Sequence, residues 1–284
     1  MAPMSHDILW AYGHFSETGP NAPRDIEADV ENIGPTLFDV VVLPFLHVHE
    51  GGALFYNDTP LEQLWDGLPD AFEQLKNGYE TKKTLILSLG PFQTDFTYAG
   101  QDLGQFVDDV ADFVATYNID GLDLDYEGDY GSANAELVAE IGNAFVEKTS
   151  GVLTLAPYTL QDFWCGDGGV LSRTATSQGS NVTWMNVQFY MGSANTPPSD
   201  WPGTFQSWAD AVASGPNNIS APDAPGFLAP GCNAETFSLD EMSDGVTLVR
   251  DKYPGVGGAF VWNYNSIVAG TAAWAQAIRQ ALGT

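Results

Sequence analysis

The chain has 284 residues and a formal net charge of −28 at pH 7, although only 16% of its residues are charged. The imbalance reflects a scarcity of Lys and Arg, which together number 9, rather than an excess of the 37 Asp and Glu residues. Such a surface repels nucleic acid and anionic membranes but not a neutral polymer, and the sequence has no run of about 18 apolar residues that could span a membrane. We therefore expect neither nucleic acid nor a membrane as a partner.

Strands and helices alternate through the first part of the chain. Apolar and amphipathic patterns predict strands at residues 7–12, 38–48 and 84–90, and helices at 26–33, 61–77 and 103–117. Residues 38–48 are almost continuously apolar, which is typical of a parallel strand buried on both faces. His47 and His49 lie near the end of this strand without the spacing of metal ligands, so we expect them to be side chains close to a loop.

Residues 119–127 form the strand around which the chain is organised. Side chains alternate between the two faces of a strand, so Asp123, Asp125 and Glu127 share one face and the apolar residues between them share the other. Like charges a few ångströms apart disfavour joint ionisation, and the group should hold at least one proton near neutral pH. A carboxyl that keeps its proton is what a general acid requires, so this strand is predicted to be catalytic.

Two plainer explanations of the carboxylates fit the sequence less well. Chance does not readily place three carboxylates at strict period 2 among leucines. The run Asp123-x-Asp125-x-Glu127-Gly128 also imitates the start of an EF-hand, but that loop needs a bidentate Glu at its twelfth position, where this chain has Asn134. We expect no metal ion and no other cofactor.

The second part of the chain continues the alternation of strands and helices. Strands are predicted at 152–158, 183–191, 226–229 and 257–263, and apolar helical positions recur at 137–145, 246–252 and 274–282. Eight strands alternating with helices indicate an α/β fold, a (β/α)8 TIM barrel, for which about 250 residues are typical. No linker, repeat or low-complexity segment divides the chain, so residues 1–284 are expected to form a single domain.

The strand at 183–191 carries an unusual polar face. Asn186, Gln188 and Tyr190 recur at period 2 in an otherwise apolar strand. Buried polar groups need partners, and a sugar in the mouth of the barrel would supply them.

The catalytic strand carries a family resemblance. Residues 120–127, Asp-Gly-Leu-Asp-Leu-Asp-Tyr-Glu, match the D-G-x-D-x-D-x-E signature of glycoside hydrolase family 18, which contains chitinases and endo-β-N-acetylglucosaminidases. Leu-Thr-Leu-Ala-Pro at 153–157 and Gln-Phe-Tyr at 188–190 are also similar to family segments. Many members have S-x-G-G where this chain has Ser-Leu-Gly-Pro at 88–91, a departure that leaves open the conformation after Gly90 but removes no catalytic group.

The resemblance implies a role for each member of the catalytic strand. Glu127 would protonate the glycosidic oxygen as general acid. Asp125 would accept the N–H of the substrate's 2-acetamido group, so that the amide oxygen becomes the nucleophile, and Asp123 would set the protonation and rotamer of Asp125. Tyr190 would form a hydrogen bond with the acetamide. Family 18 is an exception to the ordinary two-carboxylate scheme of glycosidases because the substrate supplies the nucleophile.

The resemblance also implies substrate-binding residues. Trp262 looks like the tryptophan that lies beneath the reactive sugar, and Tyr12 stands at the end of the first strand, which lines the sugar site in the family. Gln188 belongs to the polar face that a sugar would satisfy. Larger family chitinases carry an insertion before the eighth strand, for which the short interval 232–252 leaves no room, so the cleft should be comparatively open.

The function implied is a retaining, endo-acting chitinase that cleaves β-1,4 bonds between N-acetylglucosamine residues by substrate-assisted catalysis. One alternative is an endo-β-N-acetylglucosaminidase that cuts the chitobiose core of N-glycans, and another is a catalytically silent lectin that binds chitin or glycans. Silent members usually lose the final Glu or its Asp neighbour, whereas Glu127 and Asp125 are both present. The expected partner is chitin, a chito-oligosaccharide or an N-glycan, and the protein is expected to be a monomer.

Compartment and specificity are only weakly determined. The N-terminus lacks the features of a signal peptide, and we expect an extracellular protein whose signal peptide is absent from this sequence, with a cytoplasmic location left open. Cys165 and Cys232 permit one disulfide without implying it. Specificity is expected to reside in loops at 163–165 and 196–205, where sugar stacking explains an exposed Trp164 or Trp201 as readily as ordinary packing does.

Overall fold

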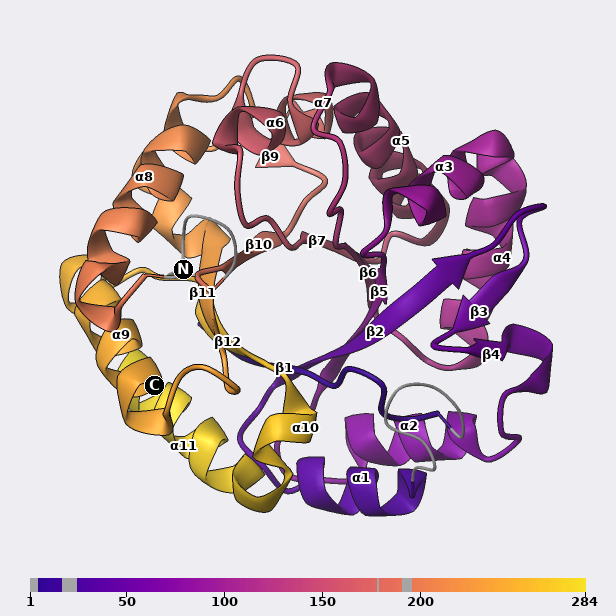
Figure 1. Ribbon diagram of the computed structural model, residues 1–284, viewed down its shortest axis with the longest axis horizontal. Helices are drawn as coiled ribbons and strands as arrows, with labels where there is room; N and C mark the ends of the chain where they lie inside the picture. The colour runs from indigo at the N-terminus through magenta and orange to yellow at the C-terminus, as the bar shows by residue number, and fades with distance from the viewer. Residues whose placement is uncertain (1–4, 17–24, 178, 191–195) are drawn as a thin grey trace.

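A computed structural model describes residues 5–16, 25–177, 179–190 and 196–284. Within these residues, eight parallel strands form a barrel surrounded by helices, as Figure 1 shows in a view along the barrel. The strand β1 pairs with both β2 and β12, which closes the barrel and confirms the predicted (β/α)8 fold. The barrel strands are β1 (His6–Trp10), β2 (Val40–Val48), β5 (Thr84–Leu89), β6 (Gly121–Leu124), β7 (Val152–Leu155), β10 (Trp184–Gln188), β11 (Leu228–Asn233) and β12 (Gly258–Trp262).

The helices lie on the outside of the barrel (Figure 1). The longer ones are α1 (Ile26–Ile33), α2 (Leu68–Asn77), α3 (Gln93–Gln101), α4 (Leu103–Thr116), α5 (Ser132–Thr149), α8 (Trp201–Ser214), α9 (Leu239–Lys252) and α11 (Thr271–Leu282). Shorter elements are α6 (Gln161–Cys165), α7 (Val170–Arg173), α10 (Tyr264–Ile267), the 3₁₀ turns η1 (Leu61–Gln63), η3 (Pro198–Asp200), η4 (Ala224–Phe227) and η5 (Val268–Gly270), and the strands β3 (Leu54–Tyr56), β4 (Thr59–Pro60), β8 (Ala175–Thr176) and β9 (Gly179–Ser180). None of the helices in the described ranges combines the length and apolar character of a membrane span.

Two apolar layers hold the barrel together. The outer layer lies between strands and helices, and β6 contributes Leu122 and Leu124 to it, with Tyr126 following in the same direction. The inner layer fills the barrel itself and includes Trp10 and Trp184. Because side chains alternate along a strand, the outward leucines of β6 direct the carboxylates between them into the barrel.

Helix α4 shows how the predicted apolar stripe becomes a packed face. Asp102 caps the helix by accepting a hydrogen bond from the backbone N–H of Gln105 at 3.2 Å. The buried residues recur at helical spacing along one face; they are Phe106, Val107, Val110, Phe113 and Val114. The helix thereby delivers the chain into β6 with the register that the site requires.

Two element boundaries differ from the sequence predictions. The seventh strand is β11 (Leu228–Asn233) rather than 226–229, because residues 224–227 form the turn η4. Gly231 fits within β11 because the Phe260 ring occupies the space of a side chain, and a Cβ at 231 would lie 2.2 Å from it. The helix predicted at 61–77 begins only at Leu68, because Pro69 is accepted in a first helical turn but not in a helix interior.

Three further segments also depart from expectation. The strand predicted at 119–127 has ladder pairing only over 121–124, and its later residues continue as extended chain. Helix α3 was not predicted, and residues 163–165 are helical rather than a loop.

The interval between the seventh and eighth barrel strands agrees with the prediction. Helix α9 follows β11 after residues 234–238, so no inserted domain lies within 232–252. Of the strand predicted at 183–191, Met191 lies outside the described residues.

Candidate active site

The deepest carboxylate of the site is fixed by strand register. Asp123 on β6 is paired in register with Ser88 on β5 and Thr154 on β7, so their inward side chains meet in one row. Ser88 Oγ donates to Asp123 Oδ2 at 3.0 Å, Thr154 Oγ1 to Oδ1 at 2.5 Å, and Asn186 Nδ2 to Oδ1 at 3.2 Å. Complete burial raises the pKa of Asp123 to about 6, and the three donors oppose this rise.

Asp125 and Glu127 lie above this row, beyond the end of the ladder. Their backbone N–H groups donate to Leu89 O at 3.0 Å and Pro91 O at 2.9 Å, which keeps the chain extended alongside the segment that follows β5. Burial, followed by the charges of Glu127 and Asp123, raises the pKa of Asp125 well above its ordinary value. Burial also raises the pKa of Glu127. The two carboxyls therefore hold a proton at a pH where ordinary carboxylates have lost theirs.

Gln188 joins the two upper carboxylates. Its Nε2 lies 3.2 Å from Asp125 Oδ1, 3.3 Å from Glu127 Oε1 and 2.9 Å from the carbonyl oxygen of Ala156. The amide nitrogen has two hydrogens for these three acceptors, and the two carboxylates face the same donor. Gln188 therefore holds Asp125 and Glu127 in a fixed relation.

Tyr190 follows Gln188 on the same side of the chain and lines the same cavity. Burial, and next the neighbouring charges of Asp125 and Glu127, raise the pKa of its phenol well above the ordinary value. The hydroxyl therefore stays protonated throughout the ordinary pH range and can donate a hydrogen bond to a bound molecule.

An aromatic wall completes the cavity, which has a volume of about 270 Å³. Tyr12 stacks on Trp262 with ring centroids 5.1 Å apart and an interplanar angle of 28°. Phe45 lies 5.6 Å from Tyr12 and 6.0 Å from Trp262. Apolar ring faces opposed to a few convergent polar groups are typical of small-molecule sites. All the residues predicted for the site lie here: Asp125, Glu127, Gln188, Tyr190, Tyr12 and Trp262 line the cavity, and Asp123 lies beneath it.

The structure adds residues that the sequence did not reveal, namely Phe45, His47, Pro91, Phe92 and Asn233. Phe92 is 60% exposed and stacks on His47, with ring centroids 5.8 Å apart. Pro91 and Phe92 follow closely after the end of β5, and this place at a strand end was the signal in the sequence that could have identified them as site residues. Asn233 was missed because β11 was placed too early in the chain.

A polar pair supports His47 behind this stack. His47 Nδ1 lies 3.2 Å from Asp95 Oδ2, and the other oxygen of Asp95 accepts the backbone N–H of Val48 at 3.0 Å. His47 was predicted to lie near a loop; in the structure it also contacts Asp95 and stacks on Phe92. Among the described residues, no group of three or more His, Cys, Asp or Glu side chains is arranged to hold a metal ion.

The departure at Gly90-Pro91 preserves the geometry of the site. Gly90 has φ +138°, and a Cβ there would lie 2.1 Å from the backbone oxygen of Asp125. Only glycine therefore allows the chain to pass this close to the backbone of Asp125. Pro91 still provides the carbonyl oxygen that accepts the N–H of Glu127.

Two expectations about the periphery are corrected or settled. Trp164 and Trp201 are both fully buried, so neither is the exposed stacking residue that the sequence left possible. Their helices α6 and α8 turn the two indoles into the packing between helices and barrel. Cys165 and Cys232 are both free and buried, so they form no disulfide.

A barrel with buried carboxyls at the carboxyl ends of its strands, facing an aromatic cavity, is typical of a glycosidase. The chain belongs to glycosyl hydrolases family 18, whose family model matches residues 11–222. No curated protein sequence matches the chain.

Solved structures share the whole fold at low sequence identity. A GH18 chitinase from Pseudoalteromonas aurantia is 17% identical with a TM-score of 0.70, and the match covers 98% of this chain and 100% of that one. A fungal endo-beta-N-acetylglucosaminidase from family 18 is 18% identical with a TM-score of 0.69, covering 98% of each chain. The xylanase-alpha-amylase inhibitor protein XAIP-I, solved with trehalose, is 15% identical with a TM-score of 0.61, covering 97% of this chain and 98% of that one. At these identities the likeness concerns the fold.

Proposed function

We propose that the protein is a chitinase that cleaves β-1,4 bonds between N-acetylglucosamine residues and retains the configuration at the anomeric carbon. The observation that carries this proposal is the pair Asp125 and Glu127, joined by Gln188 and facing an aromatic cavity. Glu127 is only partly buried and can reach a bound substrate, whereas Asp125 is 4% exposed. The raised pKa of Glu127 suits a proton donor, and the raised pKa of Asp125 suits a neighbour that holds a proton. Neither suits a carboxylate that must be ionised to act as a nucleophile.

The chemistry then proceeds in two displacements. Glu127 gives its proton to the glycosidic oxygen as the bond between that oxygen and the anomeric carbon breaks. The carbonyl oxygen of the substrate's acetamide forms the new bond to the anomeric carbon, while Asp125 accepts the acetamide N–H. Glu127, now ionised, takes a proton from water, and that water displaces the acetamide oxygen. Attack within one bound molecule can contribute roughly 7–11 kcal/mol through positioning alone.

The remaining groups hold the reacting sugar. Tyr190 keeps its proton and donates to the acetamide oxygen. The Trp262 ring, braced by Tyr12, lies beneath the sugar as an apolar floor. Asp123 receives its three donors below and sets the protonation of Asp125. The scarcity of Lys and Arg leaves an acidic surface that a neutral polysaccharide tolerates. We expect a monomer in which residues 1–284 act as one catalytic domain.

The stereochemistry of the first product tests this mechanism. Two displacements invert the anomeric carbon twice, so proton NMR in the first minutes of chitotetraose hydrolysis should show the β-anomer. Direct attack by water would give the α-anomer instead. Oligomers that lack the acetyl group at the cleaved sugar should bind but resist cleavage. An initial α-anomer, or rapid cleavage of fully deacetylated chitosan, would refute the roles given to Asp125 and Glu127.

A second candidate is an endo-β-N-acetylglucosaminidase, favoured by the fungal family 18 structure that shares the fold over 98% of each chain. That reaction uses the same bond and the same carboxylates. Product analysis on chitotetraose beside a high-mannose glycoprotein separates the two: a chitinase shortens the oligomer and leaves the glycoprotein intact. Release of whole glycans with chitotetraose untouched would establish the alternative. A protein with no turnover on either substrate at any pH would be a binding protein, a class represented on this fold by XAIP-I.

A further inference from the structure

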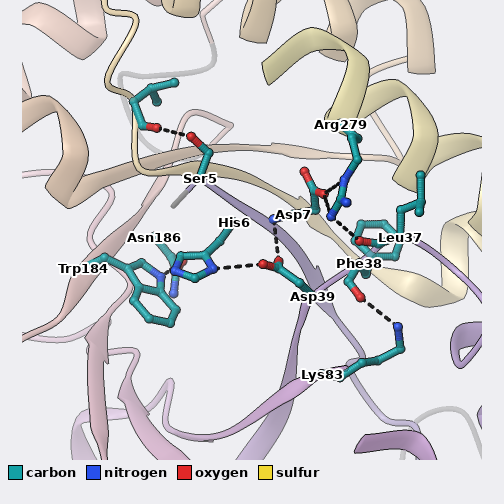
Figure 2. Close-up of polar contacts among 11 residues, drawn as sticks. Ser5, His6, Asp7, Leu37, Phe38, Asp39, Lys83, Trp184, Asn186 and Arg279 are labelled. Atoms are coloured by element: carbon teal, nitrogen blue, oxygen red, sulfur yellow. Dashed lines mark hydrogen bonds and ion pairs between the residues drawn. The ribbon is translucent and has the colours of Figure 1, made fainter. Parts of the chain in front are cut away.

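The floor of the barrel contains an indole in polar contact with Asn186, whose amide donates to Asp123. Trp184 begins β10, and its side chain shares the inward face of that strand with Asn186 and Gln188. The indole Nε1 donates to Asn186 Oδ1 at 2.9 Å, and both side chains are buried. Figure 2 shows the indole and the amide beside each other, next to the His6 ring.

The chemistry of the indole determines which way the Asn186 amide faces. An indole N–H can donate but cannot accept, so the amide atom facing Trp184 must be the oxygen. The NH2 group then faces Asp123, where Nδ2 lies 3.2 Å from Oδ1. A rotation of the amide by half a turn would oppose two donors at Trp184 and two acceptors at Asp123. Trp184 therefore excludes the alternative orientation of the amide.

The indole is itself held from below. Its ring stacks on the His6 imidazole, with centroids 4.8 Å apart and an interplanar angle of 30°. His6 Nδ1 lies 3.1 Å from Asp39 Oδ2, and the other Asp39 oxygen accepts the backbone N–H of Asp7 at 2.7 Å. Figure 2 shows these contacts of Asp39 with the His6 ring and the backbone of Asp7. His6 at the start of β1 and Asp39 just before β2 thus hold the indole of β10, and with it the N–H that faces Asn186.

We propose that Trp184 is a positioning residue for the reaction, which fixes the Asn186 amide so that its NH2 group is always presented to Asp123. The effect on turnover rests on the proposed function, whereas the effect on Asp123 does not. The groups that face Asp123 are the Ser88 and Thr154 hydroxyls, the Asn186 amide and the charge of Asp125. The titratable phenol of Tyr190 faces it from the chain after β10. Beyond Trp184 lie His6 and Asp39.

Loss of the indole donor has a definite sign. Without the indole N–H the Asn186 amide can turn, and its NH2 group then faces Asp123 for only part of the time. The ionised form of Asp123 is less stabilised, so the pKa of Asp123 rises. A hydrogen bond to a charged group is strong enough that partial loss should raise the pKa by about half a unit to one unit. In the proposed function Asp123 sets the protonation of Asp125, and we take its ionised form as the active one, so the acid limb of kcat should move to higher pH by the same amount. The KM should not change because Trp184 does not line the cavity.

The test is Trp184→Phe, which keeps an aromatic ring against His6 but removes the N–H. The titration of Asp123 is followed by carboxyl carbon NMR, assigned with Asp123→Asn, and kcat and KM are measured from about pH 3 to about pH 8. The matched control is Trp201→Phe. Trp201 is also buried and its Nε1 donates to Thr196 O at 3.1 Å, but it lies on α8 outside the barrel. The control should lose similar stability without moving the titration or the acid limb.

The outcomes separate a positioning role from a structural one. A raised pKa of Asp123 with a shifted acid limb and constant KM in Trp184→Phe alone supports the proposal. An unchanged Asp123 titration, or an equal shift in Trp201→Phe, overturns it. If the unmutated protein hydrolyses nothing, the proposed function fails but the NMR titration still decides the role of Trp184. If Trp184→Phe does not fold, benzothienylalanine at position 184 keeps the bicyclic shape, replaces the N–H by sulfur and is expected to give the same shift.

Discussion

Glu127→Gln is the sharpest perturbation of the proposed mechanism. The substitution keeps the shape of the side chain and removes the proton that the glycosidic oxygen must receive. Glu127 is only partly buried, and its side chain accepts a hydrogen bond from the Gln188 amide at 3.3 Å. The new amide can direct its oxygen toward that donor, so the fold should be little disturbed.

The size of the effect follows from the role of the proton. Positioned general acids contribute typically about 10²- to 10⁴-fold in rate, which corresponds to about 3–5 kcal/mol in the activation free energy. The structure adds a second effect. The charge of Glu127 is the second cause, after burial, of the raised pKa of Asp125, so removing it should lower that pKa. Asp125 would then ionise at a lower pH in the variant than in the unmutated protein.

The assay compares two leaving groups. Cleavage of chitotetraose needs a proton on the departing sugar oxygen and should fall by at least about 100-fold in Glu127→Gln. Release of 4-nitrophenol from its chitobioside needs little protonation and should fall much less. Asp129→Asn is the control, because it removes a carboxylate two residues along the chain whose side chain is exposed. Activity on chitotetraose within tenfold of the unmutated protein, or equal losses on both substrates, would refute a general acid at Glu127.

Three further predictions concern the carboxylates and the rim. Asp125→Asn should lower kcat by at least about 100-fold with KM little changed, because a neutral amide accepts the acetamide N–H more weakly than a carboxylate and cannot release a proton. A change confined to KM in steady-state kinetics would contradict this. Phe92→Ala should raise the KM for chitotetraose by about 2- to 10-fold, as loss of a stacking ring predicts, whereas Leu248→Ala, an exposed apolar control on α9, should not. Asp123 has a pKa of about 6 in the folded protein against an ordinary 3.8, so the stabilisation from its bound proton is present below about pH 4 and lost as pH rises through 6. In Asp123→Asn the amide can still donate to the Ser88 hydroxyl. The free energy of unfolding of this variant, measured in urea, should therefore rise by about 3 kcal/mol relative to that of the unmutated protein between about pH 4 and about pH 7.5. A difference that does not vary with pH would contradict the burial argument.

The sequence predicted most of the architecture because its signals are local. Strict alternation places Asp123, Asp125 and Glu127 on one face of a strand whatever surrounds it, and the apolar residues between them determine which face enters the barrel. The same periodicity identified the polar face of β10. Boundaries were less secure. Gly226 and Gly231 both lie near the seventh strand, and only the packing of Phe260 against Gly231 shows which of them belongs to it.

The chemistry within the site was decided by contacts between strands. The register that aligns Ser88, Asp123 and Thr154 joins residues about 30 apart in sequence, and no periodicity within one strand reports it. Burial of a side chain, like strand register, depends on tertiary contacts. Trp164 and Trp201 could not be distinguished from exposed stacking residues in the sequence, because only the packing of α6 and α8 against the barrel buries them. A sequence specifies which side chains share a face, because that depends on backbone geometry alone. Which donor meets which carboxylate, and how far water is excluded from it, depends on closure of the whole barrel, and these determine the pKa values on which the proposed reaction relies.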